Sequence, residues 1–183
     1  MEIKGTAVKS IKEFVKTKFP DRYEEWIDSL SESSRFITNS VITSGWYPLQ
    51  EAAIEPTQKV GRLLYQDIKK GAWECGRYSA ESALTGIYKI YVKFSSPGHI
   101  MDRASRIFQA YYRPSNIEVI HKTAKSVTVA IDHFPQPDST IEYRIAGWME
   151  CALEISGCKN VQVNTKSSMA RGDKNTTIEM TWD

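Results

Sequence analysis

Hydrophobic side chains follow one spacing in the first half of the chain and another in the second half. Up to about residue 114 they recur every three or four positions, which is the period of an amphipathic helix. Helices are therefore predicted before Pro20, from Pro20 onward, from Pro56 onward and up to Pro114, with residues 39–48 as a loop. The apolar positions of the first and last of these are Val8, Ile11 and Val15, and Ile100, Ala104, Ile107, Phe108 and Tyr111.

The longest predicted helix covers residues 70–93. Its apolar stripe consists of Trp73, Ala80, Leu84, Ile87 and Tyr91. Part of its surface carries only small side chains, namely those of Gly76, Ser79, Ala80, Ser82 and Ala83. Small side chains let a second backbone approach closely, and they also leave room for a ligand. Both interpretations stay open on the sequence alone.

The second half of the chain predicts four strands and one helix. "SNIEVI" (115–120) and "SVTVAIDHF" (126–134) are strand-like, as are 161–165 and 178–182, because apolar and polar positions alternate as in half-buried strands. Between them, Ile141, Ile145, Trp148, Ala152 and Ile155 step by helical intervals, and Gly157 ends the run. We therefore predict an α+β fold: N-terminal helices (about 1–114), then a four-stranded antiparallel sheet with an inserted helix (about 115–183), in a single domain of residues 1–183.

Composition limits the possible partners and the compartment. The 183 residues include 24 basic and 22 acidic side chains, a net charge of +2, so no strongly basic face for nucleic acid or an anionic membrane is indicated. No apolar run approaches a membrane span, and the first residues lack the apolar core of a signal peptide. Three cysteines fit a reducing cytosol better than a disulfide framework. A cytoplasmic protein is predicted.

Candidate reactive groups are few and widely spaced. His99, His121 and His133 form no helical metal-binding pair, and Cys151 and Cys158 lie seven apart, which is not a zinc spacing. No nucleophile elbow, phosphate loop or dinucleotide fingerprint is present. Glu150 and Glu154 are interpreted as part of a solvated helix face. We predict no metal site and no enzymatic activity.

Four stretches together resemble one superfamily. "IKGTAVKSIKEFV" looks like the start of haem-nitric-oxide/oxygen-binding (H-NOX) domains, and "AWECGRYSAESA" resembles a later helix of theirs. "RIAGWMECALEISGCKNVQV" with "SSMARGDKNTTIEMTW" is similar to the end of 4-vinyl reductase domains. These families share an α+β ligand-binding fold with the TRAPP vesicle-tethering subunits. The resemblance covers most of the chain and implies a bacterial member of this superfamily.

The chain departs from these families where they bind metal or haem. The resemblance implies a Cys-x3-Gly-x3-Cys hairpin, but Ser168, Gly172 and Thr176 stand here, and hydroxyls do not replace thiolates as soft ligands. It also implies a proximal histidine on the helix "MDRASRIFQAYYR", which contains none; His99 lies just before it. "HFPQPDSTIEYR" stands where the Tyr-x-Ser-x-Arg signature for the haem propionates is expected, and neither Tyr143 nor Arg144 substitutes for it. We therefore predict a member without haem or any other cofactor.

The resemblance, the helix face with small side chains and the many aromatic residues together predict a non-enzymatic sensory or regulatory domain that binds a small apolar molecule. Its partners would be that ligand, a signalling protein and, as an option, a second copy of the chain. The alternatives are a dimeric scaffold module of TRAPP type and a haem-binding gas sensor that uses His99. The residues predicted to line the ligand pocket are Trp73, Gly76, Ala80, Phe108, Tyr111 and Trp148.

Overall fold

The fold is seen in a computed structural model, which describes residues 1–84 and 106–183. The last part of the helix predicted for 70–93 (residues 85–93), the first part of the helix predicted before Pro114 (residues 100–105) and His99 lie outside the described residues. The helical half contains β1 (Glu2–Lys4), α1 (Gly5–Lys18), η1 (Pro20–Arg22), α2 (Tyr23–Asp28), α3 (Glu32–Ser40), β2 (Trp46–Pro48), η2 (Gln50–Ile54), α4 (Glu55–Lys59), η3 (Val60–Tyr65) and α5 (Ile68–Leu84). After a helical turn at 106–111 come β3 (Tyr112–Arg113), β4 (Asn116–Lys122), β5 (Ser126–His133), α8 (Ser139–Ile155), β6 (Gln162–Ser167), η4 (Met169–Arg171) and β7 (Thr176–Thr181).

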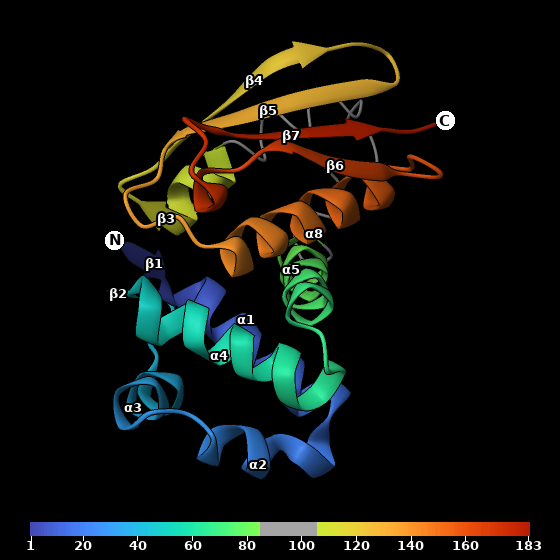
Figure 1. Ribbon diagram of the computed structural model, residues 1–183. Coiled ribbons are helices and arrows are strands. Elements are labelled where there is room, and N and C mark those ends of the chain that lie inside the picture. The colour runs from blue at the N-terminus through green and yellow to red at the C-terminus, as the bar shows by residue number, and fades with distance from the viewer. Residues whose placement is uncertain (85–105) are drawn as a thin grey trace.

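The predicted α+β fold is confirmed. The strands β4, β5, β7 and β6 form an antiparallel sheet in that order, and α8 lies in the chain between β5 and β6 (Figure 1). In the register of β5 with β7, Val127 faces Met180 and Val129 faces Ile178, and all four side chains are buried. The alternation therefore gives the sheet one apolar face, and α8 covers it (Figure 1).

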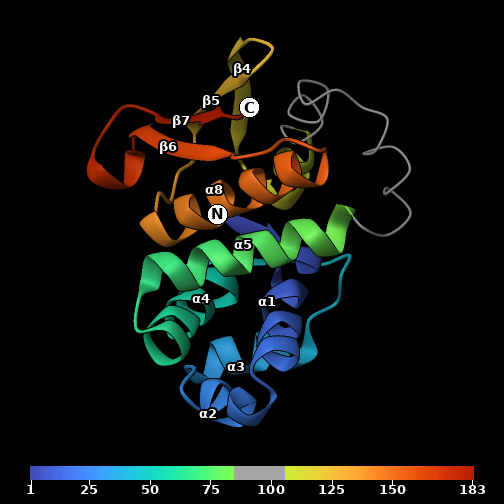
Figure 2. The same ribbon diagram turned by 90° about the vertical axis from the view of Figure 1, so that its right-hand side faces the viewer.

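Helix α8 begins and ends where its sequence predicts. The Asp138 carboxylate accepts a 2.7 Å hydrogen bond from the backbone N–H of Thr140, which is an N-cap. At the other end Gly157 has a φ of 99°, a left-handed conformation that glycine adopts without strain. Helix α5 runs across the opposite side of α8, and α1 and α4 lie beyond it (Figure 2). The helix α8 is thus buried on two sides.

The helical half contains strands that the sequence did not predict. Strands β2, β1 and β3 form a small antiparallel sheet, so the predicted loop at 39–48 was wrong at both ends, since α3 extends to Ser40 and β2 covers residues 46–48. Each of these strands is only two or three residues long, too short to display an alternating pattern. Helix α3 was also missed. The helix predicted from Pro56 begins earlier, because a wider π-helical turn, η2, precedes it and buries Ala52, Ala53 and Ile54.

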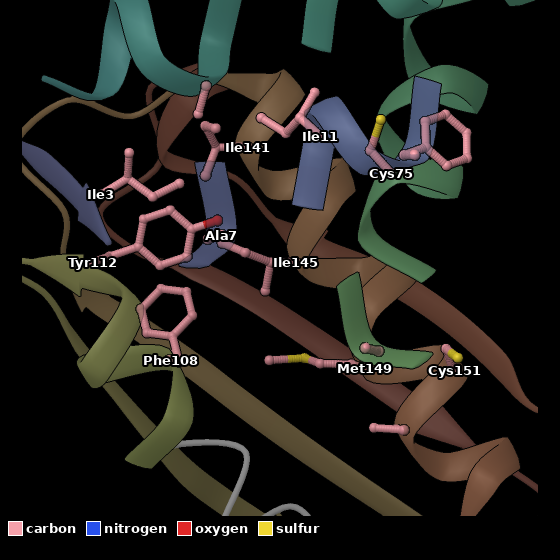
Figure 3. Packing of buried hydrophobic residues seen from close by; sticks show 14 of the residues in the cluster. Ile3, Ala7, Ile11, Cys75, Phe108, Tyr112, Ile141, Ile145, Met149 and Cys151 are labelled. Atoms are coloured by element: carbon pink, nitrogen blue, oxygen red, sulfur yellow. The ribbon is translucent and has the colours of Figure 1, made fainter. Parts of the chain in front are cut away.

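The core is continuous between the sheet and the helices. Ile3, Ala7, Ile11, Ile141 and Ile145 from both halves meet in it (Figure 3). Within residues 1–84 and 106–183, no helix is long and apolar enough to cross a membrane.

Candidate functional site

A small cavity lies where α1, α5, α8 and the segment 106–112 come together. The volume of the cavity is about 30 Å³. The empty space in and around it, including open solvent, is about 420 Å³. Ala7, Phe108, Tyr112, Ile145 and Met149 lie around this part of the core (Figure 3). The lining is completed by Gly76, Ser79, Ile107, Tyr111, Arg144 and Trp148.

Four of the six residues predicted to line a pocket are together here: Gly76, Phe108, Tyr111 and Trp148. Ala80 is fully buried on α5 but does not line the cavity. Trp73 also lies elsewhere, because its indole Nε1–H donates a 2.7 Å hydrogen bond to Glu150. Ser79, Arg144 and Tyr112 were not predicted.

The acidic pair on α8 is not a plain solvated face, contrary to the sequence interpretation. Arg77 of α5 donates hydrogen bonds to Glu150 at 2.5 Å and to Glu154 at 2.6 Å, and thereby links the two helices. The hydrogen bonds that Arg77 donates to Glu154 and to Glu150 raise the pKa of Arg77, although partial burial lowers it. Glu154 and Arg77 border a second, more open cleft of about 290 Å³, whose lining also includes Lys18 and Glu74.

Arg144 is the buried charge of the first cavity. Its side chain is only 3% exposed, and its Nη2 donates a 3.3 Å hydrogen bond to the carbonyl oxygen of Ala7. Its Nη1 has no hydrogen-bond partner among the described residues, and neither has the buried Nε1–H of Trp148. The guanidinium also acts on its neighbours: burial raises the pKa of Tyr112 and raises the pKa of Cys75 to about 12, and the positive charge of Arg144 opposes both shifts.

A second buried polar group lies under the hairpin of β6 and β7. The Glu142 carboxylate accepts hydrogen bonds from the Ser168 and Thr176 hydroxyls, each at 2.5 Å, and from the Ala170 N–H at 3.3 Å. Ser168 and Thr176 are the positions where the resemblance implies thiolates. Their hydroxyl groups therefore hold a carboxylate, and Gly172 closes the turn with a φ of 94°.

Metal ligands do not gather in the part of the chain that the structure describes: it contains no group of three or more His, Cys, Asp or Glu side chains that could hold an ion. His121 and His133 are both exposed on the sheet. All three cysteines are buried free thiols, and burial raises the pKa of each.

The helical half and the sheet with its inserted helix define an α+β class of fold. The fold itself is that of H-NOX domains. An H-NOX protein from S. oneidensis in the Fe(II)NO state superposes with a TM-score of 0.75 at 13% identity, covering 99% of each chain. The IWP-051-bound H-NOX from Shewanella woodyi gives 0.69 at 11% identity, covering 98% of this chain and 94% of that one. The A71G mutant from K. algicida gives 0.68 at 14% identity, over 99% and 97%.

No family model matches the sequence, and no relative among curated proteins does either. The similarity to solved structures therefore shows the fold alone.

Haem does not fit the described residues. The cavity of about 30 Å³ corresponds to roughly one water molecule's share of the liquid, far less than a porphyrin needs. Haem iron also needs a strong axial ligand, commonly imidazole, and no described histidine lines the cavity. Among the described residues, Arg144 is the one cation that lines the cavity. It is bonded to the Ala7 carbonyl in the cavity wall and does not lie at an exposed rim.

Proposed function

We propose that this chain is a non-enzymatic sensory or regulatory domain that binds a small, largely apolar molecule without haem. The observation that carries the proposal is the cavity at the junction of the two halves, walled by aromatic and aliphatic side chains with a few polar groups. Such a composition is typical of small-molecule sites. The fold supports it, since a similar H-NOX structure holds IWP-051 and others are in Fe(II)NO or Fe(II)CO states.

Two polar groups at the cavity, the Arg144 guanidinium and the Trp148 indole, favour binding over catalysis. A guanidinium stays protonated at any physiological pH, and an indole N–H only donates, so neither exchanges protons as a general acid or base does. We propose that the whole chain, 1–183, acts as one cytoplasmic bacterial domain and passes its ligand state to a signalling partner.

A dimeric scaffold of TRAPP type is the second candidate, and the small volume of the cavity favours it. In that case side chains fill the core, and the outer surface forms the dimer contact. Exposed apolar residues are available for a contact, since Phe36 is 71% and Ile42 65% exposed.

Native mass spectrometry of protein purified from cells under mild conditions separates the two. A retained small-molecule mass that disappears on denaturation supports the sensor. A ligand-free mass in a stable dimer supports the scaffold and contradicts the sensor. Size-exclusion chromatography coupled to light scattering on the same sample serves as the control for the oligomeric state.

A further inference from the structure

Arg144 has no carboxylate partner among the described residues, and this distinguishes it from the other arginine at an interface of α5 and α8. Arg77 is neutralised by Glu150 and Glu154 within the protein. Arg144 is more deeply buried, and its one hydrogen bond goes to a neutral carbonyl. Burying an uncompensated charge is costly, and since no described residue compensates Arg144, its guanidinium is suited to pair with an anionic ligand.

The indole N–H of Trp148 is a second buried donor without a hydrogen-bond partner among the described residues. Arg144 and Trp148 lie four residues apart on α8, hence on one face of that helix, and both line the cavity. Both of their unpartnered atoms, Nη1 and Nε1, are donors. A ligand that satisfies both must offer acceptors, and a water molecule would accept a hydrogen bond but would not neutralise the charge.

We propose, on the basis of the proposed function, that the cavity binds a monocarboxylate with an apolar body, whose carboxylate pairs with Arg144 and accepts a hydrogen bond from the Trp148 indole. One guanidinium neutralises one negative charge, and the remaining wall includes Phe108, Tyr111 and Ile145. A doubly charged phosphate would leave one charge unpaired in that wall. The enclosed volume of about 30 Å³ suits the carboxylate head group alone, so the side chains around it have to move apart to admit the apolar body.

The test uses linear carboxylates from acetate to octanoate, each compared with the primary amide of the same length. Isothermal titration calorimetry gives the dissociation constants. The indole N–H resonance of Trp148, assigned with Trp148→Phe, reports the hydrogen bond. For the longer chains of the series, we expect the acid to bind more tightly than the amide of the same length. Arg144→Met should weaken acid binding by about thirty-fold or more and leave amide binding nearly unchanged. Arg171→Met, at an exposed arginine of η4, is the matched control.

Loss of folding does not confound this variant, because removing an unpaired buried charge is expected to keep or raise the melting temperature of the ligand-free protein. Acids and amides that bind equally well, or an acid affinity unchanged in Arg144→Met, would overturn the carboxylate proposal and leave the apolar site standing. If neither series binds the wild-type protein, the carboxylate proposal and the proposed function both fail.

Discussion

Gly76 of α5 lies against the backbone of Arg144 of α8, so closely that a Cβ on Gly76 would be 2.0 Å from the Arg144 carbonyl oxygen. The contact is reciprocal, since a Cβ on Gly147 would be 2.3 Å from the carbonyl oxygen of Trp73. Two glycines therefore allow the helices to cross with their backbones in contact. The same crossing places the Arg144 residue at the wall of the cavity, so close packing and the candidate site depend on one geometry.

Gly76→Ala is expected to destabilise the protein by about 3 kcal/mol or more, because backbone cannot move aside as a flexible side chain can. Gly147→Ala should have a similar effect. Urea unfolding followed by circular dichroism measures the change, and Ser82→Ala, at an exposed position of α5, is the control. A Gly76→Ala protein as stable as the wild type would show that α5 and α8 are not in backbone contact.

The carboxylate under the hairpin gives a second prediction. Ser168→Ala removes one of the donors to Glu142 and leaves a buried carboxylate oxygen short of a hydrogen bond, which should cost about 1.5–3 kcal/mol of stability. Glu142→Gln should be destabilising too. Each carboxylate oxygen accepts from one hydroxyl, and the amide nitrogen that replaces one of these oxygens cannot accept a hydrogen bond.

A double-mutant cycle of Ser168→Ala with Glu142→Gln isolates the pair. We expect the two effects to be strongly non-additive, since both changes break the same hydrogen bond. Gln162→Ala, at an exposed position of β6, controls for general effects on that strand. Additive effects would mean that Ser168 and Glu142 do not interact.

The sequence predicted those helices and strands that are long enough to repeat their spacing of apolar residues several times. The stripe of α8 and the alternation of β5 are of this kind, whereas β2 is too short to show a period. The apolar cavity residues Phe108 and Trp148 were found because they lie on such stripes. Arg144 and Glu142 were missed because a charged residue on an amphipathic helix is normally solvated. Their burial depends on α8 being covered by the sheet on one side and by α5 on the other, which is a property of the tertiary fold.

Glu55 provides a prediction on pH. Burial raises the pKa of its carboxyl, but hydrogen bonds from Ser34 and from the backbone and hydroxyl of Ser31 outweigh this and lower it overall. The unfolded chain then binds the proton more readily than the folded protein. The contribution of Glu55 to stability is therefore complete above the unfolded pKa of about 4.3 and is lost as the pH falls through the lower folded value.

Glu55→Gln should accordingly lower the melting temperature at pH 7, and the difference from the wild type should shrink below about pH 4. Differential scanning calorimetry across this range tests it. Glu24→Gln, at an exposed glutamate of α2, should show no such convergence. A difference that stays constant with pH would mean that the carboxylate charge is not involved.

The last prediction is that the protein binds neither haem nor zinc. A porphyrin needs an axial ligand and partners for its propionates, whereas the cavity is far too small for it and holds the single cation Arg144 among the described residues. Zinc would need thiolates where Ser168 and Thr176 stand, and those hydroxyls already donate to Glu142. After expression with δ-aminolevulinate and added iron, the purified protein should show no Soret band and no stoichiometric metal, while the S. oneidensis H-NOX protein, prepared in parallel, serves as the positive control. A Soret band with near-stoichiometric iron that His99→Ala abolishes and His133→Ala does not would contradict the prediction. It would make His99 the axial ligand and the protein a gas sensor.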